Sequence, residues 1–181
     1  FPAMIEHCIE WGRDHFNEYF TDVINDAKKL LEDKEKFYAD LKKEGNTTLQ
    51  LTKLKSIKEH VVLAAEQNID KIIEFAVMQY TENFQYRIQQ LLFNFPEDYT
   101  NKDGSKFWSG SKRVPHPIPY TPQDELAFMF VKNYSTILAR ALNVKGDLSD
   151  EHIKEVSGKV KIPEFVAKTV KIKVKDDEPD E

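Results

Sequence analysis

The chain has 181 residues, a length typical of one domain, and its 40% hydrophobic and 31% charged residues exclude both a membrane protein and a wholly disordered one. Its net charge of −5 equals the charge of the five acidic residues among the last six, so the remainder is neutral, which excludes a nucleic-acid binder with a basic face. Its one cysteine, Cys8, cannot form an internal disulfide, which favours a reducing, intracellular compartment.

The first segment is predicted to form an amphipathic helix. Pro2 suits a first helical turn, and Glu6 and Glu10 match the sign of the helix dipole there. A more polar helical stretch over about residues 26–43 should end before Gly45-Asn46, a common helix stop. The apolar residues of the first segment recur mostly every three or four positions and should share one buried face: Ile5, Cys8, Ile9, Phe16, Tyr19, Phe20, Val23 and Ile24.

The same periodicity predicts helices over about residues 49–65, 69–94 and 124–142, and a short one over 149–156 that Ser149 would cap. The second should stop near Asn94, because Pro96 disfavours helical geometry at Phe95. The residues expected to face the core are Leu54, Ile57 and Val61 in the first; Ile69, Ile72, Ile73, Ala76, Val77, Tyr80, Phe84, Ile88, Leu91 and Leu92 in the second; and Leu126, Phe130, Tyr134, Ile137, Leu138 and Ala141 in the third.

Between about residues 97 and 122 the helical periodicity disappears, and glycines and prolines mark an irregular segment. Loops of this length are usually functional or disordered. Phe107 and Trp108 lie within this one, and large aromatic residues are uncommon in disordered segments. We therefore predict an ordered loop that these two rings attach to the core.

The end of the chain changes to an alternating pattern. Val170, Ile172 and Val174 alternate with lysines, which is typical of a short strand with one exposed face. The chain offers no second convincing strand, so this one should either pair with a neighbouring domain or lie as an extended tail across the helices. The predicted fold is mainly α: a helical domain over residues 1–175 with a long ordered loop and a short C-terminal β-strand, followed by an acidic tail or linker over 176–181.

Cys8 is the first candidate for chemistry. A reactive cysteine needs a helix N-terminus or a nearby cation, whereas Cys8 should lie inside the first helix on its apolar face. His7 is rotated from it by about 100°, and His15 lies about 10 Å further along the helix axis. A buried structural thiol is therefore favoured over a nucleophile.

The sequence contains no recognisable metal or cofactor motif. The remaining histidines, His60, His116 and His152, lack metal-ligand spacing, and neither phosphate-binding glycine motif is present. From composition and spacing alone, this is a helical domain with one unusual loop and an acidic end.

Several stretches, taken in order, are similar to the second catalytic cysteine half-domain of ubiquitin-activating enzymes. The FWSGxKR loop is the most specific of them and resembles the ubiquitin activator more than the activators of other ubiquitin-like proteins. The matching stretches are Phe1–His7 followed by Trp11, Gln90–Pro96, Phe107–Arg113 with Pro115, and Ile162–Phe165 followed by Lys171–Val174.

The resemblance implies a parent enzyme that uses ATP and Mg²⁺ to adenylate the C-terminal glycine of ubiquitin. A cysteine then forms a thioester with ubiquitin, which passes to a conjugating enzyme. The adenylation domain of the same chain would be a further partner, and the cytoplasm and nucleus the expected locations. In this family the nucleophile precedes a Phe-Pro pair by a few residues, so it should lie just upstream of Phe1, and the 181 residues alone should be inactive.

The family also has a supporting aspartate shortly after the Lys-Ile-x-Val strand. By position this is Asp176, with Asp177 as the alternative, and membership of a solvated acidic tail is the competing interpretation. Lys112 and Arg113 are given no catalytic role, since exposed cations are usually only solvated. The rival function is a non-catalytic helical interaction module that binds partners through the proline-rich loop.

Overall fold

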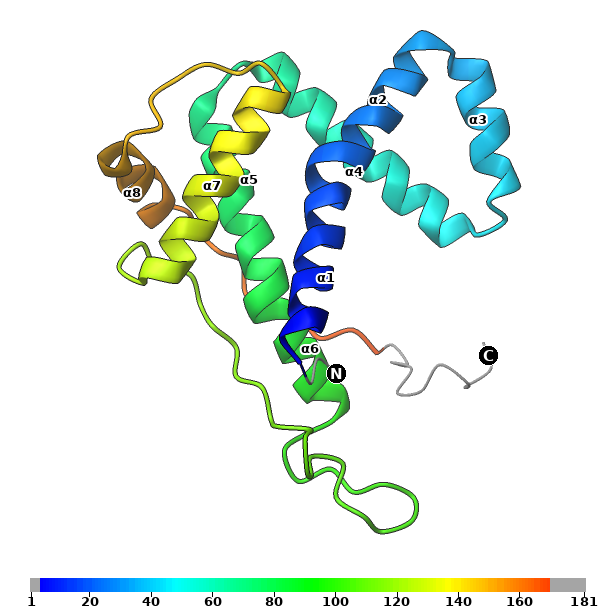
Figure 1. The fold of residues 1–181 in the computed structure, drawn as a ribbon, viewed down its shortest axis with the longest axis vertical. Coiled ribbons are helices and arrows are strands. Elements are labelled where there is room, and N and C mark those ends of the chain that lie inside the picture. Colours follow the sequence, from blue (N-terminus) through cyan, green and yellow to red (C-terminus); the bar gives the residue numbers. More distant parts are fainter. Residues whose placement is uncertain (1–3, 170–181) are drawn as a thin grey trace.

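The computed structural model describes residues 4–169, and in this range the chain is mainly helical, as predicted (Figure 1). Among these residues the only β-pairing is an isolated bridge between Thr100 and Lys106. None of their helices is long and apolar enough to cross a membrane. The elements are α1 (Ile5–Asn17), η1 (Glu18–Asp22), α2 (Val23–Glu32), α3 (Lys34–Lys43), α4 (Thr47–Glu66), α5 (Ile69–Thr81), η2 (Glu82–Tyr86), α6 (Arg87–Asn94), α7 (Glu125–Ala141) and α8 (Asp150–Gly158).

Two long, continuous helical rods, α1–η1–α2 and α5–η2–α6, each contain a π-helical turn. The segment η1 joins α1 to α2 with helical dihedrals at both junctions, and η2 joins α5 to α6 in the same way. A π-turn adds one residue to the helical repeat, so the side chains beyond it are rotated relative to those before it. The second rod ends at Asn94, before Pro96, as the sequence predicts.

The main core lies between α5 and α7, with α8 packed on their side. The predicted stripe of α5 is confirmed, and its central residues Ile72 and Ile73 are fully buried. In α7 the predicted face is confirmed at Tyr134 and Leu138, but it differs at the start of the helix, where Leu126 is 82% exposed and Ala127, next to it, is buried. Ala141 is exposed as well, and the α7 residues buried here are Ala127, Phe128, Val131, Tyr134, Ser135, Leu138 and Ala139.

A second, smaller cluster holds α2, α3 and α4 together and stands apart from α7 and α8 in Figure 1. Its buried residues are Val23, Phe37, Leu41 and Ile57. The prediction that Val61 faces inward is wrong, because α4 turns Val61 to solvent and buries Leu63 and His60 instead.

The long segment between α6 and α7 is anchored by its aromatic rings. Phe107 and Trp108 are buried, as predicted, but they form a separate cluster with Phe95 at the end of α6 and do not join the main core. The Phe95 and Phe107 rings stack with centroids 4.5 Å apart, and the Trp108 indole N–H donates to the carbonyl oxygens of Phe95 and Pro96, each at 3.0 Å.

The imidazole of His60 should make stability depend on pH. His60 is 4% exposed, its Nδ1–H donates to the carbonyl of Ser56 at 2.7 Å, and its Nε2 is buried without a hydrogen-bond partner among the described residues. Removal from water lowers the pKa of His60 below its ordinary value of 6.5. The unfolded chain therefore takes up this proton at a higher pH than the folded one.

We expect the free energy of unfolding to be unaffected by this group above about pH 6.5. As the pH falls below that value, His60 alone should lower the free energy of unfolding by up to about 1.4 kcal/mol per pH unit. Urea denaturation at about pH 7.5 and about pH 5.5 measures the loss, which His60→Gln should reduce. The matched variant His116→Gln changes an exposed histidine and should keep the wild-type dependence. An unchanged dependence in His60→Gln would contradict the assignment.

Gly146 is needed where the α7–α8 connection crosses α5. A Cβ at this position would lie 2.4 Å from the Cβ of Ile69, which is attached directly to the backbone and cannot rotate away. Gly146→Ala should therefore cost about 1–3 kcal/mol. Gly12→Ala is the control, because a Cβ there meets nothing within 4 Å and should raise helix stability by about 0.5–1 kcal/mol. Thermal unfolding of both variants checks the opposite signs, and equal shifts would contradict the steric account.

Candidate functional site

The start of α1 is the end of the helix at which the predicted nucleophile would lie. Its N-cap, Met4, has extended dihedrals (φ −134°, ψ 160°), and its side chain makes no capping hydrogen bond. The first N–H groups of a helix have no intrahelical partners, and the dipole gives this end a partial positive charge. A thiolate near this end would be stabilised, although the carboxylate of Glu6 in the first turn reduces the effect.

Cys8 is exposed, so its predicted burial is wrong. That it is not the nucleophile stays a prediction. The first half of the apolar stripe that should have buried it is in contact with solvent, because Ile5 is 68% and Ile9 63% exposed. The second half is confirmed: Val23 is buried, and the members of the stripe packed against the two buried clusters are Tyr19, Phe20 and Ile24. The helix α1 has no buried residue and is attached to the rest of the fold through a different face.

The attached face of α1 and η1 consists of Trp11, His15 and Tyr19, which follow one another at four-residue spacing. The Trp11 ring lies 6.3 Å from that of Phe84 in η2, and the Tyr19 hydroxyl accepts a hydrogen bond from Asn83 at 2.7 Å. His15 packs against Trp11 with ring centroids 4.2 Å apart, and its Nδ1 lies 3.1 Å from a Glu18 oxygen. Tyr19 belongs to the predicted stripe, whereas Trp11 and His15 were missed because the prediction followed the apolar Ile5–Ile9–Phe16 pattern on another side of the helix.

The supporting carboxylates Asp176 and Asp177, and the predicted strand at 170–175, lie outside the described residues. The structure follows the chain to Thr169. Figure 1 draws the segment after Pro163 beside α6, in agreement with the hydrogen bonds between Gln90 and Lys168.

The FWSGSKR loop, residues 107–113, has a structural role, because its aromatic rings are buried and hold the loop against the end of α6. Lys112 Nζ lies 4.6 Å above the centre of the buried Phe107 ring, a cation–π geometry that helps to hold the turn. Arg113 is exposed. Nothing in these contacts assigns either cation a catalytic role.

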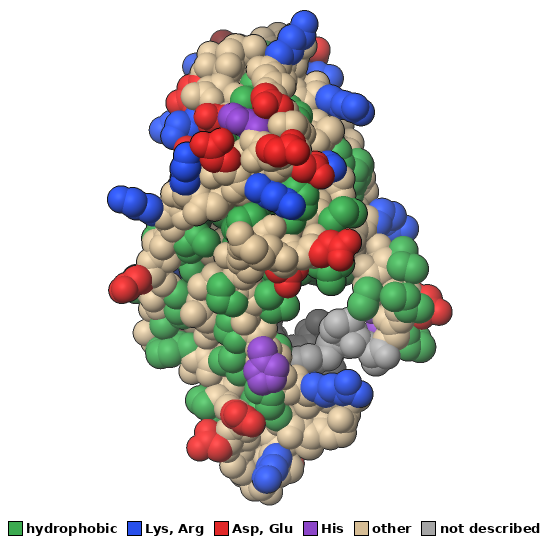
Figure 2. All heavy atoms as spheres, turned by 90° about the vertical axis from the view of Figure 1, so that its left-hand side faces the viewer, with side chains coloured by type: hydrophobic (Ala, Val, Ile, Leu, Met, Phe, Trp, Pro, Cys, Tyr) green, Lys and Arg blue, Asp and Glu red, His purple; other side chains and the backbone are tan. Residues whose placement is uncertain are grey.

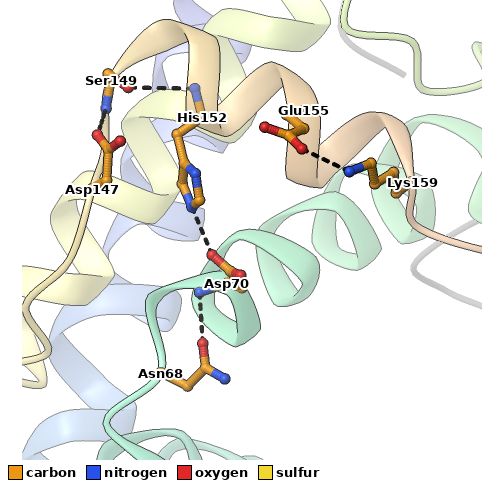
Figure 3. Close-up of polar contacts among 7 residues, drawn as sticks. All are labelled: Asn68, Asp70, Asp147, Ser149, His152, Glu155 and Lys159. Carbon is orange, nitrogen blue, oxygen red and sulfur yellow. Dashed lines mark hydrogen bonds and ion pairs between the residues drawn. The ribbon is translucent and has the colours of Figure 1, made fainter.

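The α5–α8 junction brings a serine, a histidine and an aspartate together, as Figure 3 shows. His152 Nε2 lies 2.7 Å from Asp70 Oδ1, whereas the Ser149 hydroxyl accepts from the backbone N–H of His152 at 3.3 Å. The imidazole points away from the serine and towards Asp70, so His152 does not act as a general base for Ser149. These residues have a structural role: Ser149 caps α8 and Asn68 caps α5. The His152–Asp70 contact connects α8 with α5.

The described part of the chain contains no group of three His, Cys, Asp or Glu side chains that could hold a metal ion. Figure 2 faces the side of the molecule on which α8 lies and shows acidic and basic side chains interspersed there, without a continuous basic area.

Comparison with known proteins decides the family. The family model described as the SCCH domain of the ubiquitin-activating enzyme matches residues 2–181. The chain belongs to this family. Ubiquitin-like modifier-activating enzyme 1 of Dictyostelium discoideum is 31% identical over 179 residues, which are 99% of this chain and 17% of that protein.

The same enzyme of Homo sapiens is 30% identical over 179 residues, covering 98% of this chain and 17% of its own length. Human ubiquitin-like modifier-activating enzyme 6 is 30% identical over 178 residues, covering 91% and 16%. The SCCH domain described here thus spans about a sixth of the length of these curated relatives.

Proposed function

We propose that this SCCH domain is part of an enzyme that activates ubiquitin. In the parent, the C-terminal carboxylate of ubiquitin would attack the α-phosphate of ATP, which the adenylation domain would bind with Mg²⁺, to form an acyl adenylate and release pyrophosphate. A cysteine N-terminal to Phe1 would then attack the activated carbonyl, form a carbon–sulfur bond and release AMP. The thioester-linked ubiquitin would pass to the cysteine of a conjugating enzyme.

The observation that carries this proposal is the family match over nearly the whole chain. The start of α1 supports it, because a thiol placed there would meet the uncapped N–H groups of the helix, which favour its thiolate form. A cysteine with an ordinary pKa near 8.5 is only a few per cent ionised at pH 7, so even a modest stabilisation of the thiolate raises its reactivity. A carboxylate beside a thiol raises the pKa of the thiol and so disfavours its thiolate form. The proposed role of the Asp176 carboxylate is therefore to orient the reacting groups and not to activate the thiol.

The full-length parent with ubiquitin and ATP·Mg²⁺ provides the test. We expect ubiquitin-dependent exchange of pyrophosphate into ATP and an adduct that runs on a non-reducing gel and disappears with a thiol reductant. Replacing ubiquitin with another ubiquitin-like protein should weaken both signals, and an equal response would contradict the ubiquitin assignment. A parent that binds partners through the loop at 97–122 but gives neither signal would favour the non-catalytic interaction module.

Location in the cytoplasm and nucleus is part of the same proposal. Imaging of the tagged full-length parent tests it, and confinement to a membrane-bound compartment would contradict it.

A further inference from the structure

The helix α1 carries an apolar stripe that the rest of the described chain leaves uncovered. Ile5, Ile9, Gly12 and Phe16 follow one another at spacings of four, three and four residues, which places them on one side of the helix. All four are exposed, including the large ring of Phe16 at 48%. Single exposed apolar side chains are normal, but a contiguous stripe of them indicates a binding surface.

This stripe forms one wall of the α1–α7 groove, an open groove of about 310 Å³ between these two helices. A cavity of about 150 Å³ holds one benzene ring, so the groove has room for about two side chains of that size. Among the described residues that line it, none is a lysine, arginine, aspartate or glutamate, so it accepts uncharged groups. Its walls include Trp11, Gly12 and Phe16 of α1, Phe84 of η2, and Phe130 and Ile137 of α7.

Gly12 leaves space for a second backbone beside the stripe. A Cβ at this position would meet no atom within 4 Å. A residue without a side chain in the middle of the stripe lets another helix approach α1 closely and place its own apolar side chains in the groove. From Ile5 to Phe16 the stripe extends over about 17 Å, the length of about three helical turns. The shape of this surface therefore suits a helix.

The side of α1 next to the stripe is acidic. Glu6, Glu10 and Asp14 follow one another at four-residue spacing and are exposed. Glu6 and Glu10 come directly after Ile5 and Ile9, which rotates them by about 100° from the stripe. One cation, Arg13, lies among the three carboxylates, and its Nε is 3.6 Å from Asp14 Oδ1.

The α7 side of the groove does not balance these carboxylates. Lys132 Nζ pairs with Asp150 Oδ1 at 2.6 Å, and Arg140 lies in the last turn of α7, after Ile137. The charge beside the stripe is therefore negative, and it favours a partner with basic groups next to its apolar ones.

We propose that the α1–α7 groove docks an amphipathic helix of a partner protein, with apolar side chains facing the groove and lysine or arginine side chains facing Glu6, Glu10 and Asp14. This interaction is separate from the thioester chemistry proposed above. A second copy of the chain fits the surface less well, because an isologous contact brings the same carboxylates of both copies together. Another domain of the parent also fits less well, because permanent interfaces are more hydrophobic than one flanked by exposed carboxylates.

Two synthetic peptides test the groove and its charge. One is an amphipathic helix of leucine and lysine of about 14 residues, which spans about 21 Å, and the other has glutamate in place of every lysine. Fluorescence anisotropy of the labelled peptides should show that the lysine peptide binds both the 181-residue chain and the full-length parent, about tenfold more tightly than the glutamate peptide. NMR shifts of the Trp11 indole N–H and the Gly12 amide should locate the bound peptide on the chain.

Substitutions on exposed positions separate docking from folding. Gly12→Leu fills the groove without displacing a packed atom and should weaken peptide binding about tenfold, while the melting temperature stays the same or rises because leucine favours a helix more than glycine does. Asn25→Leu adds the same side chain to an exposed position of α2 and should leave binding unchanged. Glu10→Lys should weaken binding of the lysine peptide about threefold, whereas Glu35→Lys on α3 should not.

Several results would overturn the proposal. Failure of either peptide to bind, or unchanged binding to Gly12→Leu, would exclude the groove as a docking site, and equal affinities of the two peptides would exclude a basic partner. Binding to the 181-residue chain but not to the full-length parent would assign the groove to another domain of the parent. A dimer of the chain that Gly12→Leu dissociates would assign it to a second copy.

Discussion

Replacing Trp108 with alanine should remove the anchor of the loop between α6 and α7 and destabilise it by about 3–5 kcal/mol. The indole is 8% exposed, stands at 88° to the Phe107 ring with centroids 4.9 Å apart, and satisfies the carbonyls of Phe95 and Pro96. Because this cluster is separate from the main core, the loss should be local. Hydrogen exchange at the Phe107 N–H, which donates to the carbonyl of Tyr99, should accelerate strongly while α5 and α7 stay protected.

Two control variants separate the contributions to this effect. Trp108→Phe keeps a ring but leaves the two carbonyls without their donor, and it should cost about 1–3 kcal/mol. Phe93→Ala changes an exposed aromatic residue on α6 and should stay within about 0.5 kcal/mol of wild type. Loop protection that survives Trp108→Ala would contradict the anchoring role.

Replacing Leu138 with alanine should destabilise the whole domain by about 2–5 kcal/mol. Leu138 is fully buried in α7, within the cluster that joins this helix to α5. A cavity there removes contacts from both helices of the main core and leaves few alternatives for repacking. Urea denaturation should show a lower midpoint with an unchanged slope.

The matched control for Leu138 lies twelve residues earlier on the same helix. Leu126→Ala removes the same atoms from a side chain that is 82% exposed, and it should change the free energy of unfolding by no more than about 0.5 kcal/mol. Similar losses in the two variants would contradict the assignment of the buried face of α7.

Most helices and helix ends could be predicted because their signals are local. The stretch predicted as one helix over about residues 26–43 is an exception, because α2 ends at Glu32 and α3 begins at Lys34, with Asp33 non-helical between them. Pro96 ends the second rod, Gly45 follows α3, and Ser149 caps α8 by accepting the N–H of His152. Each of these effects acts over a few residues and depends little on the rest of the fold.

Which side of a helix is buried could not be predicted as well, because the neighbouring elements decide it. The predicted stripe of α7 is periodic and apolar, yet only its later residues, such as Leu138, are buried against α5, whereas Leu126 at its start is exposed. In α1, attachment through Trp11 and His15 leaves Ile5 and Cys8 exposed. The π-turns η1 and η2 add a further error, since a constant helical period misplaces the side chains that follow them.

At the candidate site, the motifs indicated the family, but the contacts between distant residues were not visible in the sequence. Gln90 and Lys168 are separated by 78 positions, and a glutamine on a polar helix face gives no sign of pairing with a backbone amide. The burial of Phe107 and Trp108, by contrast, followed from the presence of large aromatic residues in a proline-rich segment.

Mass spectrometry of the ubiquitin adduct formed by the full-length parent, isolated without reductant, identifies the attacking sulfur. We predict that the C-terminal glycine of ubiquitin is attached to a cysteine N-terminal to Phe1, and that a Cys8→Ser parent forms the same adduct at the wild-type rate. Attachment to Cys8, or loss of the adduct in the Cys8→Ser parent, would contradict the placement of the nucleophile ahead of α1.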